Sequence, residues 1–253
     1  MINRIESYAL SEKGDYREKN EDSIFMETHE FGNRCSGIFA VADGVGGLEQ
    51  GEIASSVAVE HVKKWWSYFV KNPMPTGQIL ESLEKMTLKA DGYLKDLSKK
   101  TDEYVRMATT LSVLLIYDEM GFITHIGDSK IYRKDSRGSF SQISVNHLRK
   151  KADSDRYLLS EYLSSLSKIP SPQLLAFTLY PDERFYIGSD GAFSKESISL
   201  IRYEEKTDLC QDLITLQRKQ GERDNISIIS VLTKGEKGAV VNEKDRLLQK
   251  IID

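Results

Sequence analysis

Four aspartates stand where an apolar stretch of the chain meets a turn. Asp43 ends the run IFAVAD before Gly-Val-Gly-Gly, Asp190 stands in FYIGSDG, and Asp128 follows ITHIG. Asp224 precedes Asn225 and the last apolar stretch. A single aspartate of this kind is most often a turn residue, because Asp-Gly is a common turn signal. Four of them favour a common site, since strand ends from packed sheets can converge and converging carboxylates repel one another unless a cation neutralises them.

The chemistry of these residues suits a hard divalent cation. Aspartate carboxylates and backbone carbonyls are the oxygen ligands that Mg²⁺ and Mn²⁺ prefer. Glycine after Asp43 lets the backbone approach an ion closely, so the Gly44 carbonyl is a further candidate ligand. The candidate metal ligands are therefore Asp43, Gly44, Asp128, Asp190 and Asp224.

A charged segment, GDYREKNED, precedes the first of these aspartates and runs from Gly14 to Asp22. It places Arg17 four residues before Glu21. An arginine beside metal-binding carboxylates is suited to phosphate, because its planar fork matches two phosphoryl oxygens. Taken alone, the segment is more simply explained as a solvated charged turn.

The histidines and cysteines offer no competing site. Structural or surface roles are favoured for all four histidines, which occupy apolar-periodic, strand-end or loop positions: His29, His61, His125 and His147. Cys35 and Cys210 are too few for a disulfide framework or a zinc knuckle, and are typical of thiols in a reducing compartment.

Bulk composition is ordinary for a globular protein, with 253 residues, 40% hydrophobic and 29% charged. A net charge of -4 and a pI near 5.7 argue against a general nucleic-acid binder. The first residues lack a hydrophobic segment of signal-peptide length, and no apolar run approaches the roughly 20 residues that span a bilayer. We therefore expect a cytoplasmic protein with neither a membrane nor a nucleic-acid partner.

Hydrophobic periodicity predicts an α+β domain with helices over the outer faces of packed β structure. Strands are expected at 5–14, 23–31, 36–44, 109–118, 121–128, 130–134, 174–180, 184–191 and 225–233. Helices are expected at 52–70, 78–97 and 207–219, with a further helical stretch around 157–166. Residues 234–253 look like a linker and a short charged helix, so the domain is expected to span 1–233.

The ordered series GDYREKNED, VADGVGG, ATT, IGDSK, IGSDG and RDN resembles the metal-dependent (PPM, type 2C) protein phosphatases, in their bacterial-like branch. Each word is weak, but the set is specific, and it covers about Ile5 to Thr233. The resemblance implies a four-layer α-β-β-α sandwich, in which two central antiparallel sheets are flanked by helix pairs.

The resemblance also implies hydrolysis of phosphoserine and phosphothreonine with Mn²⁺ or Mg²⁺, without a phospho-enzyme. Asp43 would bridge two metal ions, the Gly44 carbonyl would bind one of them, and Asp190 with Asp224 would complete the other site. Asp128, together with Asp190, would hold a third, weaker ion.

The remaining roles concern water and phosphate. By the same resemblance, Glu21 and Asp22 would position metal-bound waters, and Arg17 would hold the substrate phosphate. A water activated by the two metals would attack phosphorus in line, so no side-chain nucleophile is needed. Ser189 has no histidine nearby in sequence, which favours a strand-end hydrogen-bonding role for it over a nucleophilic one.

This function implies a signalling enzyme whose partner is a phosphoprotein substrate and which opposes a serine/threonine kinase; we expect a monomer. The chain departs from the family pattern around this core. Val45 stands where many members have a histidine proton donor, and Lys130 replaces an arginine. Other departures are Ala108 before Thr109-Thr110, Asn146-His147, and the flap stretch SSLSKIP at 164–170.

Two other functions compete with this one. A regulatory phosphatase-like module would bind a phosphoprotein or partner without turnover, but it has no need of a full carboxylate set. A metal-dependent nuclease would also use clustered aspartates. The acidic balance of the chain, and its lack of a basic segment interleaved with aromatic residues, count against the nuclease.

Overall fold

The protein is described by a computed structural model over residues 1–45, 50–100, 105–152, 154–166 and 168–235. It contains two five-stranded sheets whose neighbouring strands are all antiparallel. In order, the first sheet comprises β1 (Ile2–Glu12), β14 (Ile226–Gly235), β13 (Arg184–Gly188), β7 (Lys130–Lys134) and β8 (Phe140–Gln142). The second comprises β12 (Gln173–Thr178), β6 (Met120–Ile126), β5 (Leu111–Tyr117), β3 (Arg34–Asp43) and β2 (Asp22–Phe31).

The central strands are apolar on both faces because both faces are covered. In β3, Phe39 and Val41 belong to the cluster between the two sheets, together with Ile187 of β13. Ile38 and Ala40, which alternate with them, belong to the cluster beneath the helices. Successive side chains of a strand point to opposite faces, so a doubly covered strand is continuously apolar.

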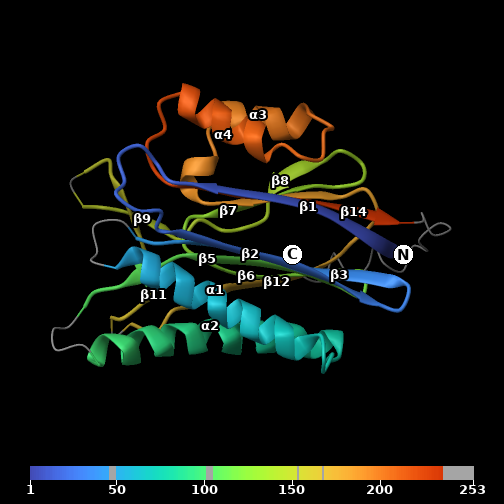
Figure 1. Cartoon of the computed structure of the whole chain (residues 1–253), viewed down its shortest axis with the longest axis horizontal. Helices are drawn as coiled ribbons and strands as arrows, with labels where there is room; N and C mark the ends of the chain where they lie inside the picture. The colour runs from blue at the N-terminus through green and yellow to red at the C-terminus, as the bar shows by residue number, and fades with distance from the viewer. Residues whose placement is uncertain (46–49, 101–104, 153, 167, 236–253) are drawn as a thin grey trace.

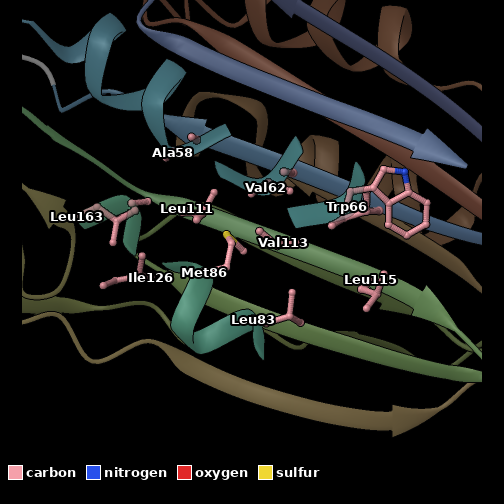
Figure 2. Packing of buried hydrophobic residues seen from close by; sticks show 14 of the residues in the cluster. Ala58, Val62, Trp66, Leu83, Met86, Leu111, Val113, Leu115, Ile126 and Leu163 are labelled. Atoms are coloured by element: carbon pink, nitrogen blue, oxygen red, sulfur yellow. The ribbon is translucent and has the colours of Figure 1, made fainter. Parts of the chain in front are cut away.

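Helices α1 (Gly51–Phe69) and α2 (Thr76–Lys99) cover the outer face of the second sheet (Figure 1). Figure 2 shows Trp66 of α1 and Leu83 and Met86 of α2 packed over β5, where Val113 and Leu115 face them. Residues 72–77, which include two prolines and a glycine, contain the turn between these helices and the start of α2. Both predicted helices are confirmed.

The first sheet is covered by α3 (Lys195–Tyr203) and α4 (Cys210–Lys219), which follow the 3₁₀ turn η1 (Asp190–Ala192). Helix α3 was not predicted from the sequence. It begins with a capping box in which Ser194 and Ser197 exchange side-chain and backbone hydrogen bonds. The serine pair, followed by apolar residues at 198 and 201, was the missed signal.

The helical stretch expected around 157–166 is wrong. Residues there form β10 (Tyr157–Leu159), paired with β9 (Leu148–Lys150), and β11 (Leu163–Ser164), paired with β4 (Ala108–Thr109). Backbone pairing with other strands, the neighbouring β9 and the distant β4, overrides a weak local helical pattern, because a short isolated helix is marginal by itself. Of the linker and short charged helix predicted at 234–253, Lys234 and Gly235 instead end β14, and the rest lies outside the described residues.

The layers follow the order helix pair, sheet, sheet, helix pair, as Figure 1 shows. This is the four-layer α+β sandwich that the sequence predicted. Within the described ranges, no helix is long and apolar enough to cross a membrane.

Candidate active site

Strand ends from both sheets bring the predicted acidic residues to one end of the sandwich. In the second sheet, Asp43 ends β3 directly opposite Asp22, which begins β2, and Asp128 follows β6 by two residues. In the first sheet, Asp190 follows β13 and Asp224 precedes β14. The predicted meeting of the aspartates is therefore present in the fold.

Burial and the crowding of like charges raise the pKa values of these carboxyl groups. Burial raises the pKa of the Asp43 carboxyl well above its usual range, and the charges of Asp22, Asp190, Asp128 and Asp224 raise it further. Burial, with a contribution from the Asp190 charge, raises the pKa of Asp128 to about 6. A cation placed among these carboxylates would relieve this repulsion.

Asp22 is also buried close to other carboxylates, and one of its oxygens lacks a hydrogen-bond partner among the described residues. Its Oδ2 accepts from Ser189 Oγ at 2.9 Å, but its buried Oδ1 has no hydrogen-bond partner among the described residues. Burial raises the pKa of Asp22 to about 6, the charges of Asp190 and Asp224 add to the rise, and hydrogen bonds from Ser227 and Ser189 oppose it. Buried polar atoms are rarely left unpaired, so Oδ1 is a candidate acceptor for a bound water or ligand for a cation.

Arg17 lies within the acidic cluster and makes a bidentate ion pair with Asp224. Its Nε and Nη2 donate to the two carboxylate oxygens of Asp224, each at 2.7 Å, and its Nη1 donates to Glu21 Oε2 at 3.3 Å. The bond to Asp224 is the main reason that the pKa of Arg17 is raised. A phosphate contact by Arg17 therefore has to share or replace the contact with Asp224.

Hydroxyl groups from the Ala-Thr-Thr and Gly-Asp-Ser motifs hold the backbone around Asp43 in place. Thr110 Oγ1 accepts from Asp43 N at 3.0 Å, and Thr109 Oγ1 donates to Asp43 O at 2.9 Å. Thr110 Oγ1 also contacts Ser129 Oγ at 2.8 Å, which ties the turn after β6 to the same point. Hydrogen bonds from the Ala-Thr-Thr motif thus connect the end of β3 to the turn after β6.

Gly44 is required by space. A Cβ at this position would lie 2.5 Å from the Gly51 backbone and 2.7 Å from Glu21 O. Its N–H donates to Glu21 O at 3.1 Å. Val45, in the position of the family's histidine, contributes only an apolar side chain.

Two positioning residues were missed in the sequence. Asn225 Oδ1 accepts from Glu21 N at 3.0 Å, and Arg218 Nη1 of α4 donates to Asp224 O at 3.0 Å. Asn225 could have been found from its place in the word RDN. Arg218 lies on a helix with no motif around it, so only the fold reveals it.

His125 has the structural role that was expected of the histidines. His125 is buried between Ser112 Oγ, 2.8 Å from its Nδ1, and Val145 O, 2.9 Å from its Nε2. Burial lowers the pKa of His125 to about 4, so the ring is neutral. Ser189, bonded to Asp22 and to Ser227 N, has the hydrogen-bonding role expected of it.

Taken together, the donor atoms fit divalent cations, but not one tight protein cage. Among the described residues, no group of three or more His, Cys, Asp or Glu side chains is clustered closely enough to hold an ion. The carboxylates are instead spread around a shared centre, with Asp22 Oδ1 unpaired and buried. Mg²⁺ commonly keeps several waters and binds through one or two carboxylates, which matches such a loose arrangement.

Comparison with known proteins identifies the family. The family described as Protein phosphatase 2C matches residues 16–233. The chain belongs to the protein phosphatase 2C family. The resemblance seen in the motif words is confirmed, and with it the expectation of an enzyme of the phosphatase class.

Relatives of this phosphatase are distant in sequence. Protein phosphatase PhpP of Streptococcus pneumoniae is 25% identical over 247 residues, covering 90% of this chain and 97% of PhpP. Serine/threonine protein phosphatase PstP of Mycobacterium tuberculosis is 24% identical, covering 87% of this chain but 43% of PstP. A Mycoplasma pneumoniae relative is 28% identical over 143 residues, 55% of this chain and 54% of that protein, so the match spans about half of its length.

Solved structures share the fold of this phosphatase. Stp1 from Staphylococcus aureus superposes with a TM-score of 0.77 at 22% identity, covering 92% of this chain and 96% of that one. The catalytic domain of PstP, solved with two manganese ions, gives a TM-score of 0.73 at 22% identity, covering 91% and 99%. These likenesses confirm the α+β sandwich.

Proposed function

We propose that this protein is a metal-dependent phosphoserine/phosphothreonine protein phosphatase. The observation that carries the proposal is the meeting of carboxylates from both sheets at Asp43, where burial and neighbouring negative charge raise its pKa. A site that concentrates unneutralised carboxylates is suited to divalent cations. The names of PstP and PhpP, and the manganese in the PstP structure, support the same function.

Five groups would hold the ions. Asp43 and the Gly44 carbonyl lie at one strand end, Asp190 and Asp224 at the facing one, and Asp128 beside Asp190 would serve a third, weaker site. Bound Mn²⁺ or Mg²⁺ would supply an acidified water as nucleophile for in-line attack and would neutralise charge on the phosphoryl oxygens.

The chain's own side chains orient this chemistry. Glu21 and Asp22, beside Asp43, present carboxylate oxygens that can accept hydrogen bonds from ordered water, and Asp22 Oδ1 is free to do so. Arg17 contacts Glu21 in this cluster and is suited to the substrate phosphate. The ion pair between Arg17 and Asp224 holds the guanidinium in position before the substrate binds.

The biological setting follows from the reaction. The substrate is a phosphoprotein, the enzyme opposes a serine/threonine kinase, and the working unit is a monomer. Its catalytic domain extends from residue 1 past the predicted boundary at 233 to Gly235, where β14 ends.

Chelation tests the function directly. Activity on p-nitrophenyl phosphate and on a phosphoserine peptide should vanish in EDTA and return with Mn²⁺ or Mg²⁺. Calorimetric titration of the ions into the chelated protein, with Asp43→Asn as the control, separates lost metal binding from unfolding. Full activity after exhaustive chelation would refute metal dependence. Metal binding without turnover on either substrate would instead indicate a regulatory module.

A further inference from the structure

Two adjoining cavities lie at the far end of the first sheet from the aspartates. The larger, of about 510 Å³, is lined by Lys134, Gly138, Phe140, Arg202, Tyr203 and Glu205. The smaller, of about 290 Å³, shares three of these residues, Lys134, Gly138 and Glu205. In the pairing of β13 with β7, Arg184 lies opposite Lys134, at the cavity end. Gly188, just before the Asp190 turn, lies four residues further along β13, about 13 Å away at ~3.3 Å per residue.

Lys134 is a largely buried cation whose anionic partner is exposed. Lys134 is 8% exposed, and its Nζ donates to Glu205 Oε1 at 2.5 Å. The Glu205 side chain is 71% exposed, and its other carboxylate oxygen lies 3.4 Å from Arg184 Nη2. A buried ammonium group without an anion is costly, whereas an ion pair to an exposed carboxylate contributes little. Lys134 therefore requires an anion, but Glu205 can be exchanged for another one.

Arg202 adds a third cation to the same lining. Its guanidinium lies 5.3 Å from the centre of the Phe140 ring, which is stacked in turn on Tyr132. This stacking holds the charge at the wall of the larger cavity while leaving its N–H groups available. Tyr203, next to it, is 75% exposed and offers an open aromatic face.

The other charged groups of the lining have structural partners. Asp182 lies 3.6 Å from Lys234 across the smaller cavity. Asp135 Oδ1 accepts from Arg137 N and Ser139 N, and so holds the turn between β7 and β8. Over both linings, four cationic side chains (Lys134, Arg184, Arg202 and Lys234) stand against three carboxylates (Asp135, Asp182 and Glu205), so the lining carries a net positive charge.

We propose that these cavities form a binding site for a phosphate monoester group, which takes the place of the Glu205 carboxylate. Such a group carries close to two negative charges and three acceptor oxygens, and arginine forks match its geometry. It can therefore contact Lys134, which lines both cavities, together with Arg202 in the larger cavity or Arg184 in the smaller one. The phosphate can belong to a small molecule or to a phosphorylated side chain of a protein. This site is separate from the aspartate cluster, and the inference does not depend on the proposed catalysis.

Calorimetric titrations with EDTA present test the site without turnover. The probes are inorganic phosphate and a phosphoserine peptide, and the proteins are the full chain and its variants. Lys134→Met and Arg202→Gln should each weaken the binding of both probes about tenfold, as expected for loss of a charge-assisted contact. Glu205→Gln should tighten it about two- to fivefold, because the competing carboxylate loses its charge.

Lys206→Met is the matched control, since Lys206 pairs with Asp212 and its side chain lines neither cavity. It should leave affinity unchanged. Equal affinity and stoichiometry in wild type, Lys134→Met and Arg202→Gln would overturn the proposal, as would an equal loss in Lys206→Met. If a melting curve shows that Lys134→Met is unfolded, the test rests on Arg202→Gln and Glu205→Gln, which replace exposed side chains. Tighter binding of the peptide than of phosphate assigns the ligand to a phosphoprotein, and equal binding assigns it to a free anion.

Discussion

Asp22 should destabilise the folded protein at neutral pH when no divalent ion is bound. Its side chain is 8% exposed, its Oδ1 has no partner among the described residues, and its pKa is raised from 3.8 to about 6, chiefly by burial. The folded state therefore binds the proton more tightly than the unfolded state does. Stability from this group is present below about pH 4 and is lost as the pH rises through 6.

The size of the effect follows from the shift. A rise of about two pKa units corresponds to about 3 kcal/mol, an upper figure for one carboxyl. Asp22→Asn removes the charge at nearly constant volume. We expect the variant to be more stable than wild type by about 1–3 kcal/mol near pH 7.5 and about equal near pH 4. The lower figure allows for an amide N–H₂ that finds no acceptor where Oδ1 stood.

Urea unfolding in EDTA at several pH values measures this difference. Asp91→Asn is the control, because Asp91 is buried but bonded, with Oδ1 accepting from Ser164 N at 2.9 Å and Oδ2 from Lys95 Nζ at 2.6 Å. That variant should lose about 1–3 kcal/mol at neutral pH. Added Mn²⁺ should stabilise wild type and narrow its deficit against Asp22→Asn. If Asp22→Asn is the less stable protein near pH 7.5, or keeps the wild-type pH dependence, the reasoning fails.

Three further changes probe the catalytic assignments. Asp43→Asn should lower kcat by several orders of magnitude, because a ligand charge is lost where carboxylates meet; more than a tenth of wild-type activity at saturating metal would contradict the assignment. Arg17→Ala should lower kcat/KM by about 10- to 1,000-fold while leaving metal affinity in calorimetry nearly unchanged, and lost metal binding would make Arg17 structural. Because Val45 cannot protonate the leaving group, a water on a third ion at Asp128 and Asp190 would be the proton donor. Asp128→Ala should then slow phosphopeptide hydrolysis far more than that of p-nitrophenyl phosphate, whose leaving group departs without a proton; equal losses in a well-folded variant would exclude this role.

Strand and helix positions were largely available from local patterns. The run IFAVAD predicted β3, and the apolar spacing through Val62 and Trp66 predicted α1, because each pattern reflects burial along one element. The failure came where a partner is distant. Leu163–Ser164 is a strand because it pairs with β4, on the far side of β5 to β10 in the chain, and no feature of its own residues required this.

The candidate site divides in the same way. Residue types and motif order were sufficient to select Asp43, Asp128, Asp190 and Asp224 and to indicate a cation, because ligand chemistry belongs to the side chains. The contacts were not predictable. Arg17 forms an ion pair with Asp224, 207 residues away in the chain. The pair exists because β14 lies beside β1 in the first sheet.

The sequence by itself determined the family, because an ordered set of short motifs carries it, and the four-layer fold followed from that resemblance. Residue types also indicated a cation site, because carboxylate oxygens suit divalent ions. Tertiary structure decided the unpaired Oδ1 of Asp22, the Arg17–Asp224 pair and the cationic cavities around Lys134. Burial and charge spacing set these properties, and both arise only when strands and helices remote in the chain pack together.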